Sequence, residues 1–157
     1  MGCTICDLIR HGEQTLWENE NFVIVFNRYP YKFGHLMIIP KCHTDRLSGL
    51  SQAERTTMIE IVSEVSDQLV GFLETDSVNH GINQGPCSGA SLPEHIHYHL
   101  VPRKHNDVGF FTIIGRESSF RHTDQDRFQI FEEFSEKLSE ALSEWGSTNS
   151  VAPTEMK

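Results

Sequence analysis

The chain has 157 residues, of which 38% are hydrophobic and 22% charged, as in one ordinary globular domain that is large enough for a core. Its formal net charge of −9 argues against the basic surface that nucleic-acid binding or a polybasic membrane contact requires. Because no segment has the pattern of a signal peptide or a membrane span, we expect a cytoplasmic location without nucleic-acid or membrane partners.

The N-terminal residues 1–12 are expected to form a short knuckle around Cys3 and Cys6. In a reducing compartment a Cys-x-x-Cys pair indicates metal or redox chemistry rather than a structural disulfide. Zinc is the favoured interpretation, because a redox motif normally follows a strand and no strand precedes this pair. Two cysteines cannot complete a tetrahedral zinc site, so two more ligands are needed.

The next segment predicts three strands separated by loops. Residues 22–26 are rich in Val, Ile and Phe, and the polar residues before them are typical of a hairpin turn. Proline and glycine mark the following loop, and Pro40 ends the third strand. The predicted strands are residues 15–17, 22–26 and 35–40, and the predicted loops are residues 27–34 and 41–46, of which the second carries His43.

A long amphipathic helix follows. Ser51 and Glu54 have the spacing of a capping box at its start. Apolar residues then recur at helical spacing, which predicts that one face packs against a sheet and that the acidic face is solvated. The apolar residues are Met58, Ile61, Val62, Val65, Leu69, Phe72 and Leu73.

Residues 77–84 predict a fourth strand, and residues 85–91 form a Gly/Ser-rich loop. Such a loop is often only a turn, but its backbone N–H groups can bind an anion. The loop leads directly into residues 95–101, where three histidines alternate with apolar residues. This period of two predicts a strand with three imidazoles on one face, suited to phosphate or metal. Incidental surface histidines and a purely metal-binding ladder are the alternatives.

The C-terminal third predicts an edge strand or a hairpin arm at residues 110–114 and a second long helix that starts at Asp124. Aromatic and aliphatic residues recur along this helix at helical spacing, and Gly146 is expected to end it. We therefore expect one domain over residues 1–146 and a flexible tail over residues 147–157.

The histidines divide into metal and catalytic candidates. His43 and His95 can join Cys3 and Cys6 in a closed, structural zinc site. His97 and His99 then remain on the polar face, and a neutral imidazole can attack phosphorus to form a phosphorus–nitrogen bond. Backbone N–H groups of the Gly/Ser loop, with Ser91, could stabilise the charge that develops. A catalytic metal site made of three histidines and a merely structural strand are the alternatives.

These motifs resemble the histidine triad family. Residues 95–101 match the pattern His-φ-His-φ-His-φ-φ, where φ is apolar, if Tyr98 is allowed as φ. The resemblance covers roughly residues 3–115. Residues 27–31 with Gly34-His35-Leu36-Met37 and Pro40, and residues 83–85 with 89–95, are similar to the branch that contains bacterial diadenosine tetraphosphate phosphorylases.

The resemblance implies an α+β fold with an antiparallel sheet of about five strands and two main helices, continued across a homodimer. It implies that His97 is the nucleophile on the α-phosphorus of a nucleotide and that His99 assists at the phosphate. The same comparison places the substrate near residues of three other segments. The implied substrate-binding residues are Asn27 near the ribose, His35 near the phosphates, Ser91 and Gln84 at phosphate oxygens, and Asn83 and Gly89 beside them.

The implied function is a nucleotide hydrolase or phosphorylase that cleaves a nucleoside phosphoanhydride, with an adenine nucleotide as the favoured substrate. Lys104 stands where phosphorylase-like members tend to have Trp, and residues 106–110 replace their Gly-Asp-x-Asn-Phe segment. This leaves the acceptor open between phosphate and water. An adenosine phosphoramidate hydrolase and a nucleotide-binding module with little catalysis are the alternative functions.

Overall fold

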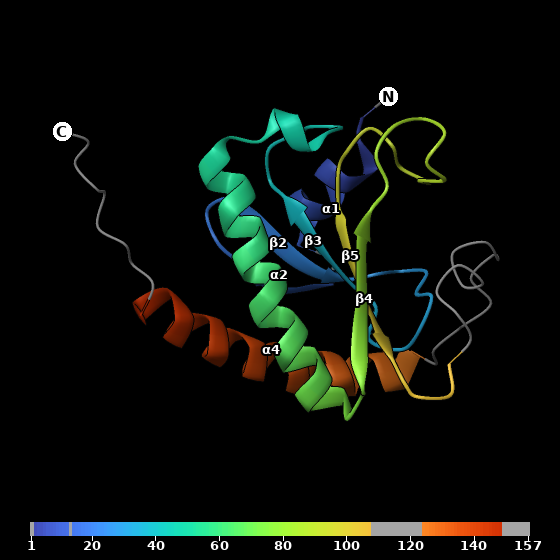
Figure 1. Cartoon of the computed structure of the whole chain (residues 1–157), viewed down its shortest axis with the longest axis vertical. Helices are drawn as coiled ribbons and strands as arrows, with labels where there is room; N and C mark the ends of the chain where they lie inside the picture. The colour runs from blue at the N-terminus through green and yellow to red at the C-terminus, as the bar shows by residue number, and fades with distance from the viewer. Residues whose placement is uncertain (1, 13, 108–123, 149–157) are drawn as a thin grey trace.

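The computed structural model describes residues 2–12, 14–107 and 124–148, and within the last range the side chains of residues 132–144. Three α-helices, five strands and a short 3₁₀-helix lie in these ranges (Figure 1). In chain order they are α1 (Thr4–His11), β1 (Thr15–Glu18), β2 (Phe22–Phe26), β3 (Leu36–Pro40), the 3₁₀-helix η1 (Leu47–Gly49), α2 (Gln52–Leu73), β4 (Ser77–Ile82), β5 (Tyr98–Arg103) and α4 (Asp124–Thr148).

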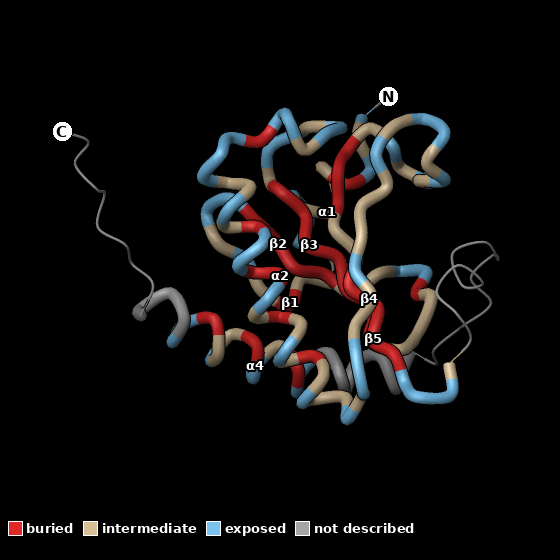
Figure 2. The backbone as a smooth tube through the Cα atoms, viewed as in Figure 1, coloured by how far each residue is buried: buried red, intermediate tan, exposed pale blue. Residues whose placement is uncertain are grey.

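The five strands form one antiparallel sheet with the order β1-β2-β3-β5-β4. The chain is therefore α+β, as expected from its sequence. In Figure 2 strand β3 is buried along its length and β2 at all but its last residue, whereas β4 is half-buried to exposed. In the described residues, β1 and β4 are the two edges of the sheet.

Alternation along the strands gives the sheet two apolar faces, since successive side chains point to opposite sides. On one face, Ile24, Ile38 and Leu100 belong to the core with α2 and α4. On the other face, a smaller cluster joins Ile5 of α1 to residues of β2 and β3. The odd-numbered His99 pairs with Met37 of this second cluster and therefore lies on the side of the sheet opposite α2.

Helix α2 forms as its sequence predicts. Ser51 Oγ accepts from the Glu54 N–H at 3.2 Å, and Glu54 Oε2 accepts from the Ser51 N–H at 2.7 Å, which completes the capping box. These two bonds satisfy donors that the first turn of a helix otherwise leaves without partners. The five buried residues of the helix, which fix it on the sheet, are Met58, Ile61, Val62, Val65 and Leu69.

Several predicted elements or boundaries are wrong: among the strands, β3 begins at Leu36 instead of His35, and β4 ends at Ile82 instead of residue 84. The N-terminal knuckle is the helix α1, whose first turn is capped by Cys3, because the Cys3 sulfur accepts from the Cys6 N–H. Strand β5 begins at Tyr98 rather than at His95, and α4 continues to Thr148, past Gly146. The predicted strand at 110–114 and residues 149–157 lie outside the described residues. The division into a domain and a tail stays a prediction.

Within the described residues, no helix combines the length and the apolar character that crossing a membrane would require.

Gly34 provides a test of how tightly the loop before β3 packs. Its φ is +77°, and a Cβ there would overlap the Leu73 side chain and lie 3.2 Å from Pro102 Cγ. Gly12 has a similar φ of +67°, but a Cβ there would have no described neighbour within 4 Å. We expect Gly12→Ala to lose about 1–2 kcal/mol of unfolding free energy from backbone strain. Gly34→Ala should lose a further 1–3 kcal/mol, roughly, from overpacking.

Urea unfolding at equilibrium measures both variants of this matched pair. Equal losses in the two variants would contradict the tight packing of Gly34 against α2 and β5, because backbone strain alone is common to both.

Candidate functional site

Of the three alternating histidines, only His99 belongs to strand β5. His95 and His97 precede the strand and are buried, with 0% and 8% of their surface exposed, whereas His99 is half-buried. A buried imidazole needs a partner for each ring nitrogen, so the hydrogen bonds of each ring determine which nitrogen carries the proton.

His95 has its two ring nitrogens in different environments. Its Nε2 donates to the Pro40 carbonyl oxygen at 2.8 Å. The neutral ring therefore keeps a lone pair on Nδ1, which lies 3.5 Å from Cys3 Sγ and 3.4 Å from Cys6 Sγ. Hydrogen bonding from the outer nitrogen of a histidine to a carbonyl is the arrangement that orients a metal-ligating ring.

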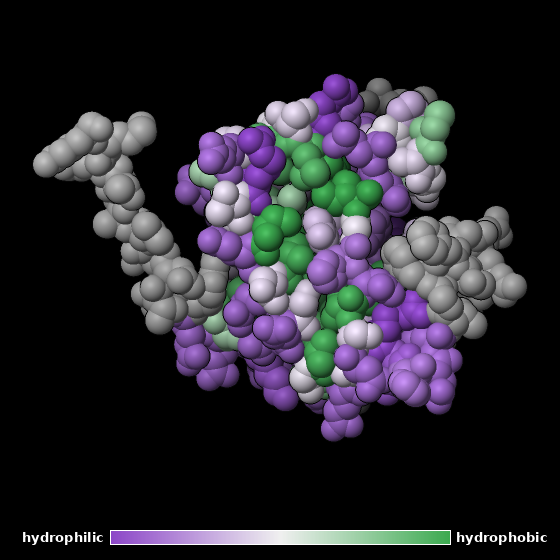
Figure 3. Space-filling model, in the orientation of Figure 1, coloured by the Kyte–Doolittle hydropathy of each residue, from purple (hydrophilic) through white to green (hydrophobic). Residues whose placement is uncertain are grey.

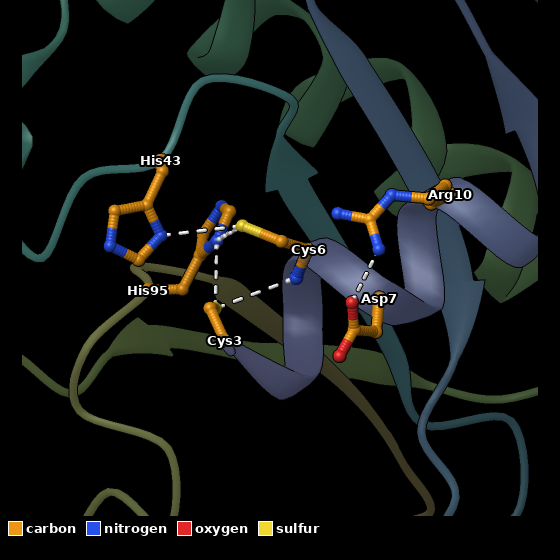
Figure 4. A network of polar contacts seen from close by, with 6 residues as sticks. All are labelled: Cys3, Cys6, Asp7, Arg10, His43 and His95. Atoms are coloured by element: carbon orange, nitrogen blue, oxygen red, sulfur yellow. Dashed lines mark hydrogen bonds and ion pairs between the residues drawn. The ribbon is translucent and has the colours of Figure 1, made fainter. Parts of the chain in front are cut away.

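His43 completes a cluster of four potential ligands. Its Nδ1 lies 3.3 Å from Cys6 Sγ, and the ligand atoms of Cys3, Cys6, His43 and His95 all lie within 4.8 Å of one another. Figure 4 shows the sulfur of Cys6 from α1 pointing toward the two imidazoles, while Asp7 and Arg10 pair with each other away from the cluster. The four residues that the sequence predicts as metal ligands are therefore brought together.

Two loops hold this cluster. The Ile96 N–H donates to the Thr44 carbonyl oxygen at 2.7 Å, so the segments that carry His95 and His43 are joined directly.

Burial, and next the neighbouring Cys3, raise the pKa of the Cys6 thiol. A bound cation would reverse that effect, because it stabilises the thiolate form.

His97 has the tautomer that a nucleophile needs. Its Nδ1 donates to the backbone oxygen of His95 at 2.8 Å. The proton of the neutral ring is therefore on Nδ1, and Nε2 keeps its lone pair. Burial lowers the pKa of His97 more than this hydrogen bond raises it, so the ring is neutral at neutral pH.

The tautomer of His99 is determined by its hydrogen bond with His35. The Tyr31 N–H donates to His35 Nδ1 at 3.1 Å, so the proton of neutral His35 is on Nε2. This Nε2 lies 2.9 Å from His99 Nδ1 and donates to it. His99 therefore carries its own proton on Nε2 and can donate it to an acceptor. The rings of His97 and His99 meet edge to face, 4.7 Å apart.

Burial, and next the charge of His97, lower the pKa of His99 from its ordinary 6.5 to about 3. Burial also lowers the pKa of His35 well below its ordinary value, with smaller effects of His99 and His97. The site thus contains three neutral imidazoles, of which one presents a lone pair and one presents an N–H.

The predicted substrate residues differ in where they lie. His35 is 1% exposed, so it could act on a substrate only indirectly, through its hydrogen bond to His99. Gln84 accepts from the Leu47 N–H at 2.9 Å through its side-chain oxygen. Asn27 accepts from the Tyr29 N–H at 2.9 Å, and its amide nitrogen lies 3.4 Å from His35 Nε2. Because that nitrogen of His35 already donates to His99, the contact with Asn27 is not a hydrogen bond.

The remaining predicted residues lie in the segment before His95. Asn83 is half-buried, and Gly89 and Ser91 are exposed. The loop that contains them is closed by Ser88, whose Oγ donates to the Gly85 oxygen at 2.7 Å. The roles of these three residues in substrate binding stay predictions.

Sequence reasoning assigned no role to Tyr31, whose ring stacks on His35 with centroids 4.9 Å apart and planes at 18°. It also missed the ion pair of Lys32 with Asp107, 2.5 Å long. Tyr31 lies four residues before His35, which is a weak signal because a loop has no fixed period. The ion pair joins residues 75 positions apart and leaves no local signal.

Comparison with known proteins assigns the chain to a family. The HIT domain family model matches residues 11–106, and the chain belongs to this family. The resemblance found in its sequence is thereby confirmed. The crystal structure of a Zn-bound histidine triad family protein from Mycobacterium smegmatis is 28% identical, with a TM-score of 0.68. The match covers 95% of this chain and 99% of that one.

Two curated relatives have names that state an activity. An AP-4-A phosphorylase of Mycobacterium tuberculosis is 36% identical over 91 residues, which are 58% of this chain and 47% of the relative. Adenylylsulfatase HINT3 of Arabidopsis thaliana is 32% identical over 124 residues, which are 77% of this chain and 60% of the relative. The matches thus span about half of these relatives' length.

The low pKa of His99 makes the stability of the fold depend on pH. The unfolded chain binds a proton at His99 near pH 6.5, whereas the folded chain binds it only near pH 3. The contribution is therefore fully present above pH 6.5 and is lost as the pH falls toward 3. Between pH 7 and pH 5, we expect His99 to account for a loss of about 2 kcal/mol of unfolding free energy.

Urea unfolding of the wild type and of His99→Asn at both pH values measures this loss. Asparagine keeps an acceptor for His35, so the variant should show a smaller decrease between pH 7 and pH 5. His105→Asn, which removes an exposed imidazole, is the matched control. The same decrease in wild type and His99→Asn would contradict the low pKa.

Proposed function

We propose that this chain is a nucleotide hydrolase or phosphorylase that cleaves a nucleoside phosphoanhydride through a nucleotidyl-histidine intermediate on His97. One observation carries the proposal: the hydrogen bond from His97 Nδ1 to the His95 oxygen leaves an unprotonated Nε2 on a ring whose centroid lies 4.7 Å from that of His99. A neutral imidazole with a fixed lone pair is a good nucleophile at neutral pH.

The proposed reaction has two steps. His97 Nε2 attacks the α-phosphorus, a phosphorus–nitrogen bond forms, and the phosphorus–oxygen bond to the leaving phosphate or sulfate breaks. Water or inorganic phosphate then attacks the same phosphorus and releases His97. The Nε2–H of His99 donates to a phosphoryl oxygen on which negative charge develops. Asn27, Asn83, Gln84, Gly89 and Ser91 are the proposed contacts to the nucleotide.

The relatives support the class of substrate and leave the acceptor to experiment. One is named a phosphorylase, which transfers to phosphate, and another an adenylylsulfatase, which transfers to water. An adenine nucleotide with a good leaving group on its α-phosphate is common to both. Hydrolysis of an adenosine phosphoramidate, and nucleotide binding with little catalysis, are the alternative functions.

A substrate panel tests the proposal. The protein is incubated with diadenosine tetraphosphate, adenylyl sulfate or adenosine phosphoramidate, with and without inorganic phosphate, and the products are separated by chromatography. ADP and ATP from diadenosine tetraphosphate only in the presence of phosphate identify a phosphorylase, whereas AMP and ATP without phosphate identify a hydrolase. His97→Ala should lower kcat by roughly a thousandfold or more, because it removes the nucleophile.

His105→Ala is the matched control and should retain full turnover, since it removes an exposed imidazole on a loop. The proposal fails if the wild type cleaves none of the panel, and His97 loses its assignment if His97→Ala remains active. Micromolar binding of AMP with no turnover would favour the binding module.

We also propose that Cys3, Cys6, His43 and His95 hold a structural zinc ion. Tetrahedral zinc with the usual bond lengths to sulfur and nitrogen places those ligands about 3.5 Å apart. The three sulfur–nitrogen distances of 3.5, 3.4 and 3.3 Å fit that separation. Four protein ligands would close the site, so zinc would join α1 to the loops around β3 and β5 and take no part in catalysis.

Metal analysis and thermal unfolding test the zinc site. We expect about one zinc per chain, lost in Cys6→Ser and retained in Cys87→Ser, which removes an exposed cysteine outside the cluster. Loss of zinc should lower Tm by roughly 10 °C, because the ion links three segments of the fold. A metal-free protein with an unchanged Tm would disprove the proposal.

The expected homodimer stays a prediction. The half-buried Val78 and Ile82 lie on the edge strand β4, and Figure 3 shows apolar surface over α2 and β4. An edge strand with apolar neighbours is suited to continuing a sheet into a second copy. The cytoplasmic location stays a prediction as well.

A further inference from the structure

An ion pair links the loop before β3 to the segment after β5. Lys32 Nζ lies 2.5 Å from Asp107 Oδ1, and their side chains are 32% and 16% exposed. The second oxygen of Asp107 accepts from the Lys104 N–H at 3.0 Å and lies 3.3 Å from Arg103 Nε. Burial raises the pKa of the Asp107 carboxyl, but the bond from Lys32 and the nearby cations lower it by more. The carboxyl is therefore ionised at neutral pH.

The loop that carries Lys32 is short and closed by backbone hydrogen bonds. The Asn27 N–H donates to the His35 oxygen at 2.9 Å, and the His35 N–H donates to the Lys32 oxygen at 3.1 Å. Between these bonds, the Tyr31 N–H donates to His35 Nδ1. Tyr31 is the residue before Lys32, so a displacement of Lys32 would also displace the Tyr31 N–H. The hydrogen bond of that N–H determines the tautomer of His35.

His35 has two competing neighbours that favour opposite tautomers. The Tyr31 N–H requires a lone pair on Nδ1, whereas the Asn27 amide, 3.4 Å from Nε2, could donate only to a lone pair on Nε2. In the second state His99 Nδ1 would donate to His35, and His99 would lose the proton on its own Nε2. The outward face of His99 would then change from a donor to an acceptor.

We propose that Lys32 and Asp107 are positioning residues, whose ion pair holds the Tyr31 N–H against His35 and so keeps His99 in the tautomer that donates. The chain of contacts runs from Asp107 to Lys32, through the adjacent amide of Tyr31 to His35, and then to His99. Its consequence for turnover rests on the proposed function, while its consequence for the tautomers does not.

The geometry favours this inference over a merely stabilising surface pair. Asp107 lies between two cations, Lys32 and the buried Arg103. Removing its charge leaves those cations to repel each other, which pushes the Lys32 loop away from β5. Loss of the Lys32 charge instead leaves Asp107 paired with Arg103, and the loop loses only its tether.

The test combines histidine NMR with kinetics on the full chain. Long-range ¹H–¹⁵N spectra of the imidazoles report which nitrogen of His35 and His99 carries the proton. We compare the wild type with Lys32→Met, Asp107→Asn, the double variant and Lys32→Arg. Glu18→Gln is the matched control, because it neutralises the carboxylate of another ion pair, 2.6 Å from Lys41, on an edge strand.

We expect wild type, Lys32→Arg and Glu18→Gln to carry the His99 proton on Nε2. Lys32→Met and Asp107→Asn should show a mixture of tautomers and a kcat lower by about fivefold, with little change in KM. The double variant should be no slower than the more affected single variant, since both changes break one contact. Those results support the inference.

Two results would overturn it: a wild-type His99 with its proton on Nδ1, or unchanged tautomers in both single variants. If the wild type cleaves no substrate of the panel, the NMR comparison still decides the inference, and only the proposed function fails. If turnover is present but falls equally in Glu18→Gln, the kinetic effect is not specific to this ion pair and the proposed role in turnover is overturned.

Discussion

The antiparallel register of β3 and β5 determines where the candidate histidines around these two strands lie. Leu36 pairs with Leu100 and Ile38 with Tyr98. Because the strands run in opposite directions, the residue before β3 lies near the end of the histidine segment, and the residues after β3 lie near its start. His35 therefore meets His99 at one end of the pairing, and Pro40 and the His43 loop meet His95 at the other. A one-residue slip would move His99 to the face that packs on α2.

The backbone of His95 connects the candidate metal cluster at one end of the β3–β5 pairing with the proposed catalytic histidines at the other. The ring of His95 donates to the Pro40 oxygen and points the Nδ1 lone pair toward the cysteines, while its carbonyl oxygen accepts a hydrogen bond from His97 Nδ1. A residue that is bonded to β3 and lies beside the two cysteines therefore also fixes the tautomer of the proposed nucleophile. Burial contributes to the same end, because it disfavours the charged form of each imidazole and leaves the hydrogen bonds to decide where the single proton lies.

The features of the fold that depend on short-range sequence patterns could be predicted from the sequence. The capping box of Ser51 and Glu54, the stripe of α2 and the strands of the sheet follow from local periodicity, and the Cys/His cluster follows from the few residues that can complete a zinc site. The helix α1 escaped prediction because a capping cysteine is unusual and the helix has only eight residues. The alternation of the histidines overstated the length of β5, since the rings of His95 and His97 are held by hydrogen bonds to backbone oxygens and the two residues take no part in strand pairing. Tyr31, Lys32 and Asp107 act through loop geometry, which leaves no periodic signal.

The neutral site is suited to a chain with a net charge of −9. A buried cation beside His97 would favour phosphate binding, but it would also compete for the lone pair on which the proposed attack on phosphorus depends. Neutral donors avoid this conflict, because an N–H fixed in place can stabilise a phosphoryl oxygen without charge of its own. The low pKa of the free His99 is compatible with that role. In the proposed reaction His99 donates as a neutral imidazole, because its Nδ1 already accepts from His35 and its Nε2 carries the proton.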